Sequence, residues 1–405
     1  MHHSLRTALV TLAAFASALV LSPAARAQGS LTPPAGTPAP AMKSLDQIEP
    51  RTDVLTLPGD AGHDHIISAP GSYFLSRDIA STSGRSAILI AADDVTLDLG
   101  GFAIRHVSGP ASVNYRGINA ATPHRNLVVR HGTVSGWARQ GIALTAITGG
   151  LYEDIRVIDN AYGGMLVGAR SILRRCVSHA NGPSDADDRG ISAGPGSLIE
   201  DCATHALRGV GAKGIVAGDG STVVRCIVTG LTDGGAFGIT LGTGSFARDC
   251  TVSNNTGTSF IAFLLGNHSR AEHCVATHNS GAESKGFAAW NGTVGAVISR
   301  STASANAGSG IFLPSRCHVL DTTATANGVH GIHLAGTENV VERCFLSHNT
   351  GRGLYADGTG NLIIANRARG NTAGNYGWVG GNKNAVVLTV APGFTNTDPT
   401  ANLAY

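Results

Sequence analysis

Aromatic and charged side chains are both scarce in this 405-residue chain, at 5% and 14% of the sequence. So little charge excludes a coiled coil, and a hydrophobic content of 42% excludes a disordered chain. No CxxC pair, nucleophile elbow or phosphate-binding loop occurs, so the usual signatures of zinc ribbons, α/β hydrolases and nucleotide-binding enzymes are missing. What the chain has instead is glycine, with 54 residues, and a regular repeat.

Long apolar runs are also missing, except near the N-terminus. Residues 1–6 are short and basic, residues 8–21 are mostly apolar, and residues 25–27 form an Ala-Arg-Ala cleavage site. This pattern predicts a signal peptide over residues 1–27 and a protein exported to the periplasm or the outside of a bacterial cell. An uncleaved membrane anchor is the alternative, but the run is short for the ~20 residues of a spanning helix. We therefore expect no transmembrane segment in the mature chain.

An excess of charge of either sign is absent as well. Of the 29 Lys and Arg residues, Arg6 and Arg26 fall in the predicted signal, and the remaining 27 balance the 27 Asp and Glu residues. A neutral body argues against nucleic acid as a partner. Electrostatic recognition must therefore come from local clusters.

The repeat is clearest over residues 164–279, which contain five copies of one unit, each with a cysteine 12 to 14 residues after its start. The cysteines recur at intervals of 24 to 26 residues, and strands ~4.8 Å apart would leave each equivalent to its neighbours. We predict an interior column of small apolar fillers, not disulfides or a metal site. This column consists of Cys176, Cys202, Cys226, Cys250 and Cys274, and continues as Ser301, Thr322, Cys344 and Asn366. A second column, five residues further on, consists of Asn160, Asn181, Asn255, Asn279, Asn306, Asn327, Asn349 and Asn371.

Glycine-apolar starts recur at spacings of 21 to 26 residues from Gly117 to Gly353, with Phe260 filling one place. Each unit contains two or three short β-runs separated by Gly or Asn turns, which predicts an all-β chain folded as a parallel β-helix of about 12 coils. Asparagine in these turns is expected to adopt left-handed backbone and to bond to the next coil through its amide. We assign residues 28–50 to a Pro-rich linker, 51–86 to an N-terminal cap, 87–371 to the β-helix and 372–405 to a C-terminal cap and tail.

The Gly-Ile-x-Leu starts, the Cys and Asn columns and the opening Val95-Thr96-Leu97-Asp98-Leu99 resemble right-handed parallel β-helix repeat proteins of the pectate-lyase-like superfamily. The resemblance covers residues 52–371 and implies a right-handed solenoid. It does not decide the activity, because that superfamily includes lyases, hydrolases, epimerases, tailspikes and non-catalytic accessory proteins.

One region departs from the repeat by collecting charge. Arg189 and Lys213 each precede a start on adjacent coils, and His179 and His205 each follow a column cysteine by three residues. The intervening turns contribute Arg208 and the carboxylates Asp185, Asp187 and Asp188. Long loops on a rigid scaffold are where function concentrates. A solvated loop with local ion pairs is the alternative interpretation.

This charged region supports a hypothesis about uronate chemistry. Elimination needs a cation to neutralise the substrate carboxylate and a base to remove the neighbouring proton. We predict His179, His205, Arg189 and Lys213 as catalytic candidates, and the three aspartates as ligands of Ca²⁺, a hard cation that prefers oxygen. Further candidates for substrate binding are Arg208, Lys285, Trp290 and Tyr355.

The sequence therefore predicts an exported β-helix that binds carbohydrate, with lyase or epimerase action on an acidic glycan as one hypothesis. The alternative is a non-catalytic periplasmic or surface accessory or adhesion protein. Whether the chain is an enzyme stays open at this point.

Overall fold

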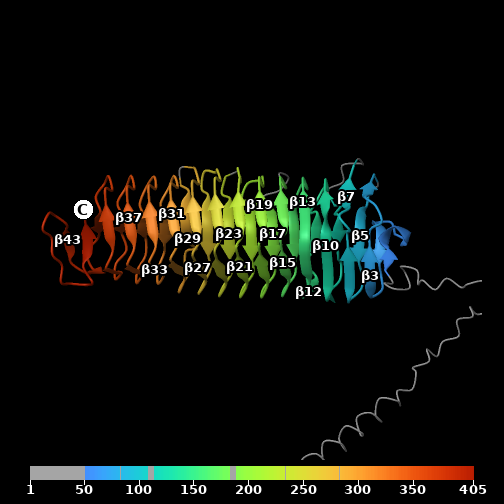
Figure 1. The fold of residues 1–405 in the computed structure, drawn as a ribbon, viewed down its shortest axis with the longest axis horizontal. Helices are drawn as coiled ribbons and strands as arrows, with labels where there is room; N and C mark the ends of the chain where they lie inside the picture. The colour runs from blue at the N-terminus through green and yellow to red at the C-terminus, as the bar shows by residue number, and fades with distance from the viewer. Residues whose placement is uncertain (1–50, 83, 108–113, 183–187, 233, 282) are drawn as a thin grey trace, which may run out of the picture. The chain divides into compact units, whose positions relative to one another are not determined.

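The computed structural model describes residues 51–405, apart from 83, 108–113, 183–187, 233 and 282. The predicted signal peptide and Pro-rich linker lie outside the described residues. The described part consists of short strands and one short 3-10 helix, η1 (Val54–Thr56), stacked in chain order along one axis (Figure 1). No helix in this part is long and apolar enough to cross a membrane.

The strands form two large sheets and one small one. Within each sheet, neighbouring strands pair in parallel. The 14-stranded sheet consists of β2 (His63–Ile67), β5 (Ser86–Ile90), β8 (Ile118–Asn119), β11 (Ile142–Leu144), β14 (Gly163–Val167), β17 (Arg189–Ala193), β20 (Lys213–Ala217), β23 (Phe237–Leu241), β26 (Ile261–Leu265), β29 (Lys285–Ala289), β32 (Ile311–Leu313), β35 (Ile332–Leu334), β38 (Leu354–Ala356) and β41 (Tyr376–Trp378). The small sheet pairs β9 (His124–Arg125) with β12 (Ile147–Thr148).

The 28-stranded sheet contains two ladders that share the long strands β10 (Leu127–Ser135) and β13 (Leu151–Ile158). Ladder 1 further contains β1 (Thr52–Asp53), β3 (Gly71–Phe74), β6 (Val95–Asp98), β15 (Ile172–Arg174), β18 (Leu198–Glu200), β21 (Thr222–Val224), β24 (Phe246–Arg248), β27 (Arg270–Glu272), β30 (Val297–Ser299), β33 (His318–Leu320), β36 (Val340–Glu342), β39 (Leu362–Ile364) and β42 (Lys383–Asn384). Ladder 2 contains β4 (Ile79–Ser81), β7 (Ala103–His106), β16 (Val177–His179), β19 (Ala203–His205), β22 (Ile227–Thr229), β25 (Thr251–Ser253), β28 (Val275–Thr277), β31 (Thr302–Ser304), β34 (Thr323–Thr325), β37 (Phe345–Ser347), β40 (Arg367–Arg369), β43 (Val387–Thr389) and β44 (Asn402–Ala404).

The solenoid matches the predicted fold and number of coils. Twelve strands of the 14-stranded sheet, β5 to β38, belong to the range expected to form the β-helix. The same sheet continues by one strand at each end, with β2 and β41, into the segments expected to act as caps. A rung consists of one strand from the 14-stranded sheet, one from ladder 1 and one from ladder 2. Successive rungs place like residues one above another.

The cysteine column is interior, as predicted. All seven cysteines are buried and free. The Cys250 thiol donates to the Arg248 carbonyl oxygen at 3.2 Å, so its hydrogen-bonding capacity is used within its own rung. The predicted continuation of the column is confirmed, because the Cys274 amide donates to Ser301 Oγ at 3.1 Å. Cys317 belongs to a different column, since its amide donates to Asn339 Oδ1 at 2.9 Å.

The asparagine column is also interior, and its amides bond from rung to rung. Asn306 Nδ2 donates to Asn327 Oδ1 at 3.1 Å and to the Ala276 carbonyl oxygen at 3.0 Å, so both neighbouring rungs are joined through one buried side chain. The prediction that these asparagines are left-handed is wrong. The left-handed residue is the one before, as at Ala305 (φ 52°) and Ala326 (φ 54°). The chain turns there, which directs the next side chain inward.

One rung was misaligned by the sequence pattern. Register pairs Phe237 with Ile261 and Ile239 with Phe263, so Ala262, not Phe260, takes the place of the start glycine. That place is tight: a Cβ on Gly214 would lie 2.5 Å from Val228 Cγ1 and 2.6 Å from the Gly238 carbonyl oxygen. Only glycine or a small residue therefore fits there.

Candidate functional site

The outer face of the 14-stranded sheet carries two columns of outward side chains. In strands such as β35 the flanking side chains are buried and the residue between them is more exposed, as in Ile332-His333-Leu334, whereas Leu264 and Ala288 in the same column are buried. The first column precedes the start glycines and contains Arg189, Lys213, Phe237, Ile261, Lys285, Ser309, His330 and Arg352. The second column contains Ser192, Val216, Thr240, Leu264, Ala288, Phe312, His333 and Tyr355. We call this surface the outer face.

Three cations on the outer face are placed against aromatic rings. Lys213 Nζ lies 5.8 Å from the centre of the Phe237 ring, and Lys285 Nζ lies 5.3 Å from that of Phe312. The Arg352 guanidinium lies 5.1 Å from the centre of the Tyr355 ring. A cation over a ring face is attracted by the ring quadrupole, which orients the side chain without neutralising its charge.

Trp290 stands between two hollows on this surface. Its ring is 52% exposed and lies 5.7 Å from that of Phe237. A hollow of about 400 Å³ on one side is lined by residues that include Asp219, Thr243 and Asn267. A hollow of about 220 Å³ is more apolar and carries one cation; Ile261, Leu264, Lys285 and Phe312 are among its lining residues. An exposed indole beside a hollow that contains Lys285 suits a ligand with a flat face and an acidic group.

The structure pairs the predicted catalytic residues two by two. Arg189 and Lys213 are register partners on β17 and β20, and His179 and His205 are partners on β16 and β19 of ladder 2. Burial lowers the pKa of Lys213. Burial also lowers the pKa of His205, with a smaller contribution from the charge of His179, so His205 is a neutral base at pH 7. The two pairs lie on different sheets and are linked through the turns that follow β16 and β19.

The predicted calcium ligands are only partly described. Asp185 and Asp187 lie outside the described residues. Asp188 is 3% exposed, and its carbonyl oxygen accepts from the Lys213 amide at 2.7 Å. Among the residues that the structure describes, no group of three or more His, Cys, Asp or Glu side chains could hold a metal ion. The Ca²⁺ site therefore stays a prediction.

The predicted substrate-binding residues are spread along the solenoid. Lys285 lies in β29 with Trp290 directly after it, and Tyr355 lies in β38, so these three share the outer face with Arg189 and Lys213. Arg208 differs, because it is exposed in the turn after β19, where its amide donates to the Asn181 carbonyl oxygen at 3.0 Å. The structure thus places most of the candidates on one face, but across several rungs.

A cluster near the C-terminal end of the outer face was not predicted. His333 Nε2 lies 3.1 Å from Asp357 Oδ2, and the Arg352 amide donates to His330 Nδ1 at 2.9 Å. The His330 and His333 rings lie 4.9 and 5.3 Å from the Tyr355 ring. All except Asp357 belong to the two outward columns, so column membership was the available signal.

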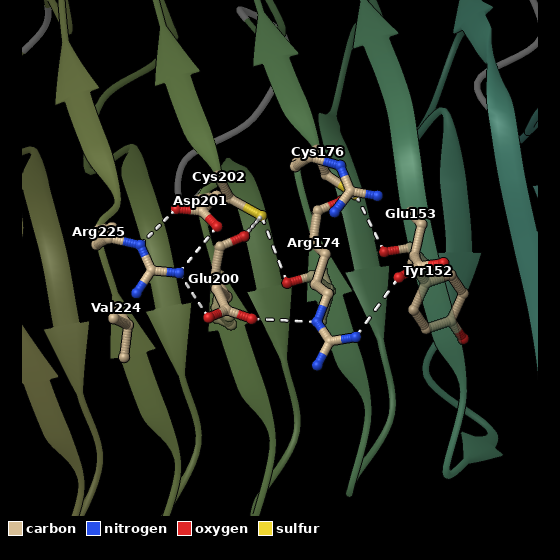
Figure 2. Close-up of polar contacts among 12 residues, drawn as sticks. Tyr152, Glu153, Arg174, Cys176, Glu200, Asp201, Cys202, Val224 and Arg225 are labelled. Carbon is tan, nitrogen blue, oxygen red and sulfur yellow. Dashed lines mark hydrogen bonds and ion pairs between the residues drawn. The ribbon is translucent and has the colours of Figure 1, made fainter.

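Charges on ladder 1 are arranged differently. Arg174 Nε lies 3.1 Å from Glu200 Oε2, and Arg225 bonds to Glu200 and Asp201 at 2.6 and 2.8 Å (Figure 2). Arg175 makes two bonds of 2.7 Å to Asp154. We call this surface the paired-charge edge. Hydrogen bonds from the arginines lower the pKa of Asp154, Glu200 and Asp201.

Comparisons with known proteins identify the fold. A family profile described as "Right handed beta helix region" matches residues 285–388. The mannuronan C-5 epimerase AlgE4 A-module of Azotobacter vinelandii is 14% identical, with a TM-score of 0.52 over 78% of this chain and 90% of that one. A variant of the periplasmic alginate epimerase AlgG is 11% identical, with a TM-score of 0.51 over 87% and 83%. No curated protein matches. This chain therefore folds as a right-handed parallel β-helix.

Proposed function

We propose that this protein is exported and binds an acidic polysaccharide lengthwise along its outer face. The observation that carries the proposal is the row of cations placed against aromatic rings beside the exposed Trp290. Aromatic faces pack against sugar rings, and ammonium and guanidinium groups pair with carboxylates. These pairs recur at intervals of three rungs along the axis, which suits a polymer better than a small ligand.

A polyuronate is the first ligand to test. The similar solved structures are named as a mannuronan epimerase and an alginate epimerase, and at their low identity the likeness concerns the fold. What favours a uronate in this chain is the cationic hollow beside Trp290, where Lys285 would meet a carboxylate.

Lyase or epimerase action at the predicted catalytic residues forms part of this proposal. Arg189 and Lys213 would neutralise the uronate carboxylate, and His205, whose pKa is lowered, would accept a proton at neutral pH. Asp185, Asp187 and Asp188 would hold Ca²⁺ beside them. Arg208 would contact the polymer from the adjoining turn.

The binding proposal is tested by affinity for alginate and polygalacturonate, compared with a neutral glucan. Trp290→Ala and Lys285→Ala should each weaken binding to the acidic polymers by about fivefold, because each removes a contact of order 1 kcal/mol. Lys383→Ala is the matched control, since Lys383 is exposed in β42 on ladder 1. Equal affinity for the neutral glucan, or an equal loss in the Lys383 variant, would contradict the proposal. Tight binding without turnover would instead favour the accessory-protein alternative.

A further inference from the structure

Strands β35 and β38 bring four groups capable of proton transfer or anion binding to one spot on the outer face. Register pairs His333 with Tyr355, and the two rings lie 5.3 Å apart. His330 and Arg352 stand in the neighbouring column, with the His330 ring 4.9 Å from that of Tyr355. All four side chains are partly exposed, so a ligand on the outer face can reach them.

The hydrogen bond to Asp357 defines which nitrogen of His333 is available. Asp357 Oδ2 is a carboxylate oxygen and accepts from His333 Nε2–H at 3.1 Å. In the neutral imidazole this leaves Nδ1 with its lone pair. The His333 side chain is 19% exposed, whereas Asp357 is 41% exposed at the rim. A carboxylate that orients an imidazole and stabilises its protonated form is the usual partner of a general base.

His330 has the opposite tautomer. Its Nδ1 accepts from the Arg352 amide, so the proton of the neutral ring is on Nε2. Burial lowers the pKa of His330, and the nearby His333 and Arg352 add to this effect while Asp357 opposes it. Because the Arg352 amide occupies the Nδ1 lone pair, neutral His330 offers its Nε2–H as a donor and has no free lone pair with which to act as a base. With the Arg352 guanidinium it provides two kinds of donor for one carboxylate.

We propose that His333, oriented by Asp357, removes the C5 proton of a uronate residue whose carboxylate is bound by Arg352 and His330. The C5–H bond breaks, its proton goes to His333 Nδ1, and its electron pair moves into the carboxylate as an enediolate that the two donors stabilise. The Tyr355 hydroxyl then supplies a proton. Delivered to the opposite face of C5, this proton inverts the centre; delivered to the C4 oxygen as the C4–O bond breaks, it completes an elimination. Neither route needs an oxidant or a metal ion.

This centre rests on the proposed binding of a uronate and is an alternative to the predicted catalytic residues, since its strands β35 and β38 lie five and six rungs from β20, which contains Lys213. The two locations make different predictions. If the proton is removed at β35 and β38, variants at Lys213 or His205 should weaken binding or leave turnover intact. If it is removed at β17 and β20, variants at His333 should have no effect on turnover.

The test is deuterium incorporation at C5 when the full chain is incubated with oligomannuronate or oligogalacturonate in D₂O, measured by mass spectrometry and NMR. Exchange reports the first step whichever product follows, and ultraviolet absorbance distinguishes elimination from epimerisation. His333→Gln should lower exchange by on the order of 10²-fold or more, the usual loss for a general base. His318→Gln is the matched control, because His318 faces Glu342 at 3.8 Å on ladder 1.

Asp357→Asn tests the positioning role separately. We expect a smaller loss of exchange than in His333→Gln, because the imidazole loses the acceptor that orients it, and partial recovery of exchange in Asp357→Glu. Binding of the oligouronate and the circular dichroism melt should be unchanged in these variants. Binding without exchange in the wild type, or exchange that survives His333→Gln, would overturn the catalytic centre and leave the binding proposal standing. Absence of uronate binding would overturn both.

Discussion

Two surfaces of the same solenoid use charge in opposite ways. At the paired-charge edge each arginine faces carboxylates on its own or a neighbouring rung, with Arg225 as the clearest case at 2.6 and 2.8 Å (Figure 2). On the outer face Lys213, Lys285 and Arg352 are placed over aromatic rings. A carboxylate partner cancels the field of a cation, whereas an aromatic ring orients the cation and leaves its field intact.

Both surfaces repeat with the period of the rung, but they differ in role. The charges of the paired-charge edge bond to one another, whereas the outer face is the surface that we propose binds the ligand. Alternating charge along an edge complements itself from rung to rung, as in the register series Glu153, Arg174, Glu200. Such an edge is satisfied without a ligand. Cations over aromatic rings can attract an anionic ligand, and Asp357 is a rim carboxylate next to His333 among the described residues of this face.

The largest expected effect is obtained by inverting charge on the outer face. Lys213→Glu combined with Lys285→Glu replaces two attractions for a polyuronate with two repulsions, each of order 1 kcal/mol at an exposed site. We expect affinity for alginate to fall by on the order of 10³-fold, and by less at high salt because exposed charges are screened. Isothermal titration calorimetry at two salt concentrations measures both. The same inversion at Arg174 and Arg225 is the control, and an equal fall there would remove the distinction between the two surfaces.

The fold was predictable from the sequence because every rung of a solenoid imposes the same packing constraints on equivalent residues. The start glycines, the buried cysteines and the buried asparagines each recur at the period of the rung, so one missing copy does not hide the pattern. The prediction of the start position was wrong in one rung, where another small residue takes the place of the start glycine. Ala262 occupies the glycine position two residues after Phe260, and Phe263 next to it stacks on Phe287 with ring centres 4.8 Å apart.

The candidate site was harder to predict because it depends on which outward residues meet across rungs. His333 and Asp357 are 24 residues apart, and only the register of β35 and β38, with the turn after β38, brings them to 3.1 Å. The sequence pattern favoured the charged turn before Arg189, since unusual loops stand out against a repeat. Residues that keep the repeat, such as His330 and Arg352, do not stand out. Their proposed role in the site becomes apparent only from the rings and the backbone amide that they contact in the structure.

Acidification should destabilise the outer face near His330 at a higher pH than the paired-charge edge near Asp154. The pKa of His330 is lowered by burial, so its neutral form favours the folded state: this stability is complete above about pH 6.5 and declines as the pH falls below that value. The pKa of Asp154 is lowered by Arg175, so that stability persists to about pH 4 and is lost only below it. Hydrogen exchange of β35 and β38 should therefore rise between pH 6.5 and 5, before that of β13 and β15.

The measurement is hydrogen exchange by mass spectrometry, corrected for the intrinsic dependence of exchange on pH. His330→Gln is the internal control, because it should abolish the early rise at β35 and β38 and leave β13 and β15 unchanged. Simultaneous loss of protection in both regions would show that the solenoid opens as one unit, and that these local pKa differences do not decide where it opens first.

The smallest expected effect is at the paired-charge edge itself. Arg225→Ala removes contacts to Glu200 and Asp201, but all three side chains are partly exposed, and exposed ion pairs contribute little to stability. We expect the melting temperature to change by about 2 °C or less, with alginate affinity unchanged. Differential scanning calorimetry and the titration used for the outer face measure the two quantities. A fall of 10 °C would mean that the alternating charges hold the rungs together, whereas a change in affinity would mean that the polymer also contacts this edge. A small effect on both would leave the asparagine and cysteine columns of the interior as the groups that set the rungs, and the outer face as the surface that meets the ligand.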